Sequence, residues 1–416
     1  MTQPASVQQR PEGDASTRRR IATTLPMLGP AFVAAVAYID PGNVAMNVTA
    51  GASFGYRLLW VVLAANLTAM LVQYLSAKVG LATGRTLPEL CRDRYRTGVR
   101  LGLWFQAEIV VIMTDIAEVV GAAVALNLLF GIPIAAGGAL SAACMVTVLA
   151  VHSRRRRMFE AVVCGFLLIV LLAVCYQVIA AGLDMPAVAG GLVPSLAGPY
   201  SVAVAVGIIG ATVMPHAIYL HSALTASLAP GSGIEERRAA LRGTRLDVLI
   251  ALSVAAVVNT SMLVSATVLR HEGELSLSEA YTRFGEVLGP AIATVFAVAL
   301  LASALVASSV GVYAGQVVMA GLLRRTTPLW LRRAVSIVPA VVVLALGWSP
   351  MDALLVSQIV LSFGVPFVLV PLLRLTADRE VMGELVNRRG TTVVAWVAAA
   401  LIIGLNAVLL GQQLAG

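Results

Sequence analysis

Two short stretches of this 416-residue sequence place polar side chains beside a proline inside an apolar run. The first reads DPGN, at residues 40–43, and the second reads MPH, at residues 214–216. Proline lacks a backbone donor and clashes with the carbonyl of residue i−4, so each stretch should break a helix. Broken backbone at membrane depth is tolerated where it is buried in protein or lines a cavity. Both stretches therefore predict freed carbonyl groups beside polar side chains, an arrangement that can bind a cation.

The groups at the two breaks form a mixed set of metal ligands. Asp40 supplies a carboxylate, Asn43 an amide oxygen and Met214 a thioether, and the carbonyl of Ala211 lies where unwinding would expose it. Oxygen ligands suit Mg²⁺, Ca²⁺ and Mn²⁺, whereas sulfur favours softer transition metals. The set thus indicates Mn²⁺ or Fe²⁺, with Cd²⁺ as a surrogate. The alternative is a plain proline kink, with Asp40 paired to a base and Met214 only filling space.

A second group of residues could carry protons. Glu108, Asp115 and Glu118 are spaced so that a helix would place all three on one face. Acids buried in this way need water, bases or protonation. His216 and His221 follow the second break, and histidine is suited to proton exchange. The alternative is structural, with the acids holding helices together and the histidines hydrogen-bonding within the fold.

The composition shows which elements must position these residues. The chain is 59% hydrophobic and 12% charged, whereas a soluble domain is about 45–50% apolar and about 25% charged. We expect an all-α integral membrane protein, preceded by a disordered cytoplasmic tail over residues 1–24. Eleven segments are apolar over about the 20 residues that a crossing needs: 27–51, 58–80, 102–129, 133–151, 159–182, 200–226, 246–269, 288–322, 333–348, 352–373 and 392–414.

The basic residues predict how the chain is oriented. With the N-terminus in the cytoplasm, all of the 29 lysines and arginines except Arg57, Arg270 and Arg283 fall on the cytoplasmic side. An odd number of spans then leaves the C-terminus outside the cell. Because these residues are spread over six separate segments, they indicate membrane topology and argue against a nucleic-acid partner.

The two breaks occupy corresponding places in the chain. They fall in the first and sixth spans, which begin two halves of five spans with opposite orientation. Paired interrupted helices of this kind point to a binding site near the membrane midplane of a transporter. The predicted units are a first repeat over 25–182, a second over 183–375, and a loop with an eleventh helix over 376–416.

Together, these motifs resemble the Nramp family of divalent-metal transporters, and within it the bacterial proton-coupled manganese transporters. The likeness covers residues 25 to 414 and includes DPGN, MPHAIYLHSAL, MTDIAEVVG at 113–121 and SQIVLSFGVP at 357–366. It implies a LeuT-like fold of two inverted five-helix repeats with broken first and sixth helices. It also implies a metal site made by Asp40, Asn43, the Ala211 carbonyl and Met214, which Gln358 joins in some conformations.

The resemblance further implies proton transfer through Asp40, Asp115, Glu118 and His216. Either Arg332 or Arg333 would close this network toward the cytoplasm. The implied activity is proton-coupled import of divalent metal, Mn²⁺ foremost and also Fe²⁺ and Cd²⁺, by alternating access across a bacterial-type inner membrane. We expect metal ions, protons and the lipid bilayer as partners, no cofactor and no obligate protein partner.

Other classes of protein fit the residues less well. An enzyme is not expected, because His216 and His221 are five residues apart rather than the four of an HExxH motif, and no nucleophile elbow or phosphate loop is present. A sodium- or proton-coupled symporter of organic solutes could use the same scaffold. Such a carrier docks a substrate carboxylate at the broken helices, where Asp40 would repel it. A passive channel is disfavoured by the paired breaks.

Overall fold

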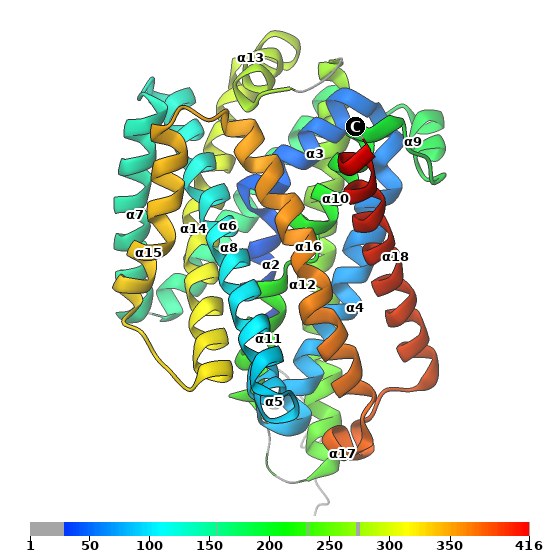
Figure 1. Ribbon diagram of the computed structural model, residues 1–416. Coiled ribbons are helices and arrows are strands. Elements are labelled where there is room, and N and C mark those ends of the chain that lie inside the picture. The colour runs from blue at the N-terminus through cyan, green and yellow to red at the C-terminus, as the bar shows by residue number, and fades with distance from the viewer. Residues whose placement is uncertain (1–28, 155, 230, 232, 272–274, 416) are drawn as a thin grey trace, which may run out of the picture.

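All the regular elements of the described chain are helices (Figure 1). The computed structural model describes residues 29–154, 156–229, 231, 233–271 and 275–415, and the tail predicted over 1–24 lies outside them. In chain order the elements are α2 (Pro30–Val36), η2 (Ala37–Ile39), α3 (Pro41–Phe54), η3 (Gly55–Leu58), α4 (Leu59–Thr83), α5 (Leu87–Arg94), α6 (Thr97–Phe130), α7 (Ile134–Arg154), α8 (Arg156–Ala181), α9 (Met185–Gly191), α10 (Gly198–Thr212), α11 (Pro215–Ala226), α12 (Ile234–Ala266), η4 (Thr267–Leu269), α13 (Leu277–Leu288), α14 (Pro290–Leu323), α15 (Leu329–Ala345), α16 (Pro350–Ala377), α17 (Arg379–Met382), η5 (Gly383–Leu385) and α18 (Arg389–Ala415).

The predicted all-α membrane architecture is confirmed. Within the described residues, seven helices are long and apolar enough to cross a membrane, or eight if the bent pair formed by α8 and α9 is one span. This number is below eleven partly because α3 and α4 join in one helical stretch over Pro41–Thr83 and because α2 with η2 is short. Each of the eleven predicted segments nevertheless coincides with a helix or with a helix broken at a proline.

The first span breaks at Asp40, as predicted. The short helix η2 ends at Ile39, Asp40 is extended with φ −66° and ψ 164°, and α3 starts at Pro41. Pro41 lacks the N–H that a continuous helix would offer to the carbonyl of Ala37. The chain therefore leaves helical geometry at the acid and resumes it at the proline.

The sixth span breaks in the same manner. Helix α10 ends at Thr212, Val213 and Met214 are non-helical, and α11 starts at Pro215. Pro215 is four residues after Ala211, so the Ala211 carbonyl has no helical donor. The sequence prediction of an exposed carbonyl at this position agrees with the backbone.

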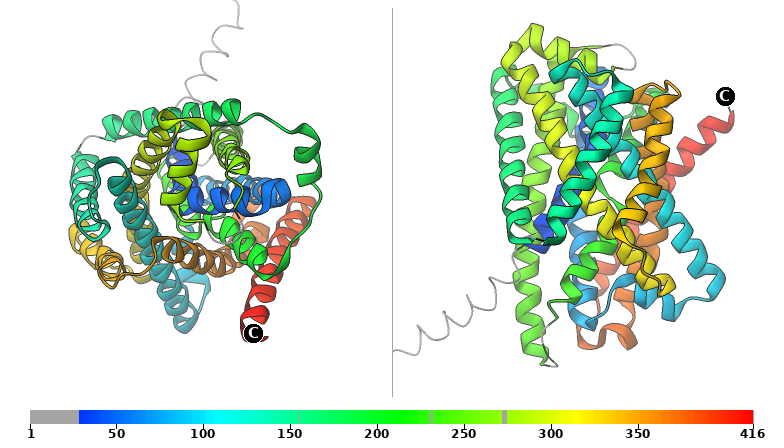
Figure 2. Two further views of the ribbon diagram at one scale, coloured as in Figure 1. Left: turned by 90° about the horizontal axis from the view of Figure 1, so that it is seen from above. Right: turned by 90° about the vertical axis from the view of Figure 1, so that its left-hand side faces the viewer.

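The broken helices lie inside the bundle. The α10–α11 span is 94% buried over its apolar window, whereas α18 is only 28% buried. Seen from above, α3 crosses the interior with other helices around it, and α18 lies at the outer edge (Figure 2). Freed backbone groups at the breaks are therefore surrounded by protein, which is the condition for tolerating them at membrane depth.

Four short α-helices, α5, α9, α13 and α17, lie outside the predicted spans, and two of them, α5 and α13, start in the same way. Each of these two begins with a capping box: Thr86 with Glu89 in α5, and Ser276 with Glu279 in α13. Hydrogen bonds from Ser276 lower the pKa of Glu279. The S/T-x-x-E pattern is visible in the sequence and could have indicated both helix starts.

Candidate functional site

Asp40 lies at the first break with its carboxylate turned toward the start of α3. Its Oδ1 accepts a hydrogen bond from the backbone N–H of Asn43 at 3.0 Å, and its Oδ2 accepts one from that of Gly42 at 3.2 Å. The side chain is completely buried. Among the described residues it forms no ion pair, so the alternative in which a base pairs with Asp40 has no support there. The first turn of α3 holds the carboxylate in place and leaves it lone pairs for a further ligand.

Asn43 belongs to a buried network of amides that the sequence reasoning missed. Its Nδ2 donates to the Tyr38 carbonyl, which lies just before the break, and to Asn259 Oδ1 at 3.2 Å. Its Oδ1 accepts from Asn47 Nδ2 at 2.6 Å, and Asn259 in turn donates to Asn66 at 3.4 Å. The network fixes the orientation of the Asn43 amide. Single asparagines inside apolar spans, such as Asn66 and Asn259, were the available signal.

Gln358 of α16 links the two breaks. Its side-chain amide lies against Gly42, where an added Cβ would meet Gln358 Nε2 at 1.9 Å. Its backbone carbonyl lies against α10, where a Cβ on Gly210 would meet the Gln358 oxygen at 1.9 Å. The Oε1 atom of Gln358 is buried and accepts no hydrogen bond from the described residues. The structure therefore places this predicted ligand beside both breaks with a free acceptor oxygen.

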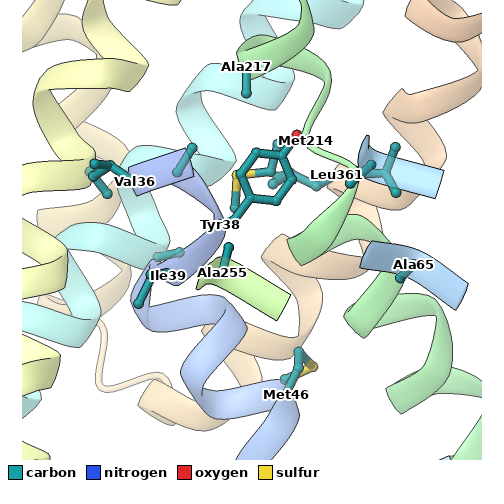
Figure 3. Close-up of a cluster of buried hydrophobic side chains, with 14 of the residues drawn as sticks. Val36, Tyr38, Ile39, Met46, Ala65, Met214, Ala217, Ala255 and Leu361 are labelled. Atoms are coloured by element: carbon teal, nitrogen blue, oxygen red, sulfur yellow. The ribbon is translucent and has the colours of Figure 1, made fainter. Parts of the chain in front are cut away.

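Met214 and Ala211 contribute from the second break, and both are completely buried. Figure 3 shows Met214 in one cluster of buried side chains with Tyr38, from the first broken span, and Leu361 of α16. The thioether of Met214, from the second break, therefore lies in the same cluster as Tyr38 of the first broken span.

The donor set of this region is mostly uncharged. Among the described residues, no group of three or more His, Cys, Asp or Glu side chains is placed to hold a metal ion. Asp40 would be the single carboxylate among an amide, a carbonyl and a thioether. A site with one charge binds a divalent ion less tightly than a cage of several acids.

The acids of α6 are paired with two arginines of α15. Arg333 Nη1 forms an ion pair with Asp115 and lies 3.9 Å from Glu118 Oε2, and all three side chains are buried. Arg332 Nη2 lies 2.7 Å from Glu108 Oε2. Each arginine therefore serves a different acid. Gly315 of α14 makes room for Arg332, because a Cβ there would lie 2.0 Å from its guanidinium.

The paired acids border the first break. Pro41 packs against Gly121, one turn after Glu118, where a Cβ would lie 2.1 Å from the proline ring. Both oxygens of Glu118, and Oδ2 of Asp115, are buried without a hydrogen-bond donor in the described part of the chain. These atoms can accept protons.

The two histidines lie in different surroundings. His216 Nδ1 is 3.4 Å from the hydroxyl of Thr114, the residue before Asp115, so His216 lies beside the acidic face of α6. His221 Nδ1 instead meets Gln73 Oε1 at 2.8 Å, and Gln73 donates to the Tyr38 hydroxyl at 2.5 Å. The structure thus places His216 against Thr114, next in the chain to Asp115, and connects His221 to the first break through Gln73 and Tyr38.

Comparison with known proteins identifies the family. The model of the natural resistance-associated macrophage protein-like (Nramp) family matches residues 31–412. The chain belongs to the Nramp family. It is 48% identical to the divalent metal cation transporter MntH of Deinococcus radiodurans over 402 residues, covering 96% of this chain and 92% of that protein. It is 45% identical to MntH of Bacillus subtilis over 390 residues, covering 93% and 92%.

Solved structures agree with this Nramp assignment. A manganese transporter of Eremococcus coleocola superposes with a TM-score of 0.86 at 32% identity, covering 98% of this chain and 90% of that one. Mhp1, a nucleobase-cation-symport-1 family transporter, superposes with a TM-score of 0.63 at 14% identity over 92% of this chain and 93% of that one. The second likeness shows the fold alone. The LeuT-like fold predicted for this Nramp protein is confirmed.

Proposed function

We propose that this Nramp protein transports divalent transition-metal ions across the membrane, Mn²⁺ foremost and also Fe²⁺ and Cd²⁺. The observation that carries the proposal is the contact of Gln358 with both Gly42 and Gly210, because it brings the two helix breaks to one place. The relatives named as divalent metal cation transporters and manganese transporter support the choice of ion. An organic carboxylate is disfavoured as substrate, because Asp40 would repel it.

The ion would exchange part of its water shell for ligands from both breaks. Asp40 and Asn43 would bind from the first, and the Ala211 carbonyl and Met214 from the second, with Gln358 Oε1 joining them from α16. The thioether would favour transition metals over Mg²⁺ and Ca²⁺, whose preferred ligands are all oxygen. Since the ligands come from different helices, a movement of one helix would open the site to one side of the membrane.

The coupled proton would leave the site by way of α6. A metal ion binds the ionised form of Asp40, so metal binding would release a proton held there. Asp115 and Glu118 lie near the first break and offer buried acceptor atoms, and His216 lies against Thr114, the residue before Asp115. The route would continue toward the cytoplasm through two ion pairs between α15 and α6. These are Arg333 with Asp115 and Arg332 with Glu108. His221, which reaches the break through Gln73, would have a separate role at the Tyr38 side.

The orientation is part of the proposal. The distribution of basic residues favours an N-terminus in the cytoplasm and a C-terminus outside the cell. With acid outside, metal and proton would then both move inward by alternating access. A bacterial-type inner membrane is the corresponding location.

Uptake of Mn²⁺ into proteoliposomes with an acidic exterior tests the proposal. We expect the wild type to accumulate Mn²⁺ in the presence of excess Ca²⁺ and to acidify the lumen, and we expect Asp40→Ala to do neither. Asp184→Ala, at the exposed start of α9, is a matched control that should transport normally. Normal uptake by Asp40→Ala would refute the assignment of the site. Mn²⁺ uptake without acidification would refute proton coupling alone.

A further inference from the structure

A cavity of about 570 Å³ lies away from the two helix breaks, at the end of the bundle that carries α5 and α17 (Figure 1). Its walls come from α4, α12 and the segment that leads from η5 into α18. This is the end that the basic residues assign to the cytoplasm. None of the proposed metal ligands or proton-carrying residues lines it.

The charge of the cavity is positive and uncompensated. Lys78, Arg245 and Arg388 line it, together with one acid, Glu384. That acid is already paired, because Glu384 Oε2 lies 3.1 Å from Arg238 Nη2. Within the described chain, no carboxylate forms an ion pair with any of the three cations. An anion entering the cavity would therefore meet three basic groups without displacing a carboxylate from any of them.

Lys78 and Asn387 supply the deepest polar groups of the cavity. Lys78 is only 9% exposed, and its Nζ donates to Asn387 Oδ1 at 2.7 Å. The Nδ2 atom of Asn387 is buried and finds no acceptor among the described residues. A buried ammonium and a buried amide donor without an acceptor are both costly in free energy. A bound anion could accept from both groups.

The rest of the lining is apolar and continues onto the membrane-facing surface. Leu71, Leu241 and Val248 lie within the cavity. Leu249, at its edge, is 44% exposed, and the adjacent Ile250 is exposed to the same extent. A small inorganic anion would leave this apolar surface uncovered, whereas hydrocarbon chains would cover it.

From this combination we propose that the cavity binds an anionic phospholipid of the cytoplasmic leaflet. The headgroup phosphate would contact Lys78, Arg245 and Arg388, and the acyl chains would run along α4 and α12. The location of the cavity fits, because anionic lipids of this leaflet attract basic segments at the membrane surface. The lipid would join α4 and α12 to the start of α18.

Native mass spectrometry of the full-length protein in detergent, titrated with phosphatidylglycerol or phosphatidylcholine, tests this proposal. The test variant is Arg245→Gln/Arg388→Gln, and the matched control is Arg242→Gln/Arg389→Gln. All four arginines are exposed, so folding is not threatened, and equal melting temperatures without lipid would verify this. One basic residue near an anionic membrane surface strengthens binding roughly fivefold. We therefore expect the test variant to bind phosphatidylglycerol about thirtyfold more weakly than the wild type.

The control should retain wild-type affinity, and phosphatidylcholine should bind weakly to all three proteins. Equal weakening in both double variants would show only general electrostatic attraction and would overturn the site. Equal binding of phosphatidylcholine and phosphatidylglycerol would do so as well. Complete displacement of phosphatidylglycerol by millimolar inorganic phosphate would assign the cavity to a soluble anion and would overturn the lipid assignment.

Discussion

Replacing Gly210 of α10 with alanine should slow metal transport by about a hundredfold, although the change adds only one methyl group. The new Cβ would lie 1.9 Å from the Gln358 carbonyl oxygen and 2.7 Å from the Ser362 nitrogen. Both are backbone atoms of α16, so no side-chain rotation can relieve the clash. Ordinary van der Waals contact begins at 3.4 Å, which requires α10 and α16 to separate by about 1.5 Å.

Two effects of this substitution on stability oppose each other. Alanine in place of glycine favours an exposed helix by about 1 kcal/mol, whereas overpacking costs about 1–3 kcal/mol. We therefore expect Gly210→Ala to be neutral or destabilising overall. The separation would also move Gln358 away from the second break, where the Ala211 carbonyl lies. A misplacement of about 1 Å in a functional site can lower a rate about a hundredfold.

Initial rates of Mn²⁺ uptake in proteoliposomes and thermal unfolding in detergent would measure both effects. Gly102→Ala is the control, because a Cβ on this residue of α6 meets no atom within 4 Å. It should transport normally and be no less stable than the wild type. If Gly210→Ala transported Mn²⁺ at the wild-type rate, the reasoning that Gln358 must lie close to both breaks would be refuted.

Three other substitutions test separate parts of the proposed mechanism. Met214→Ala should lose the preference for Mn²⁺ and Cd²⁺ over Ca²⁺, and competition in uptake assays would show it; undiminished selectivity would exclude the thioether as the cause. Asp115→Asn should destabilise the protein, by at most about 3–5 kcal/mol, because it removes the nearer of the two carboxylates that pair with the buried Arg333 and leaves Glu118 at 3.9 Å. The double variant Asp115→Asn/Arg333→Gln should recover part of that loss in thermal unfolding, and no recovery would argue against the pair. Asp247→Ala should speed hydrogen exchange in α2, because Asp247 accepts hydrogen bonds from the backbone N–H groups of Gly29 and Ala31; unchanged exchange would contradict this anchoring role.

The sequence was sufficient to predict the broken spans, because the proline effect is local. Pro41 and Pro215 end helices for reasons contained in the backbone itself. The acids of α6 share a face for an equally local reason, the helical repeat. The separation of the two repeats at residues 182 and 375 stays a prediction.

Contacts between distant helices could not be predicted in the same way. The separate pairing of Arg332 with Glu108 and of Arg333 with Asp115 depends on how α15 lies against α6. The position of His221 beside Gln73, rather than beside the acids, depends on how α11 lies against α4. Neither follows from spacing along one chain segment, because the register between two packed helices is set by all the side chains between them.

In the proposed mechanism, the two helix breaks together form one metal site. Anomalous X-ray scattering from crystals soaked in Cd²⁺ tests this claim most directly, with wild type and Asp40→Ala measured under the same conditions. We predict a single strong peak in the wild type that is coordinated by Asp40 from the first break and by Met214 from the second, and no peak there in the variant. A peak elsewhere in the bundle, or an unchanged peak in Asp40→Ala, would contradict the claim.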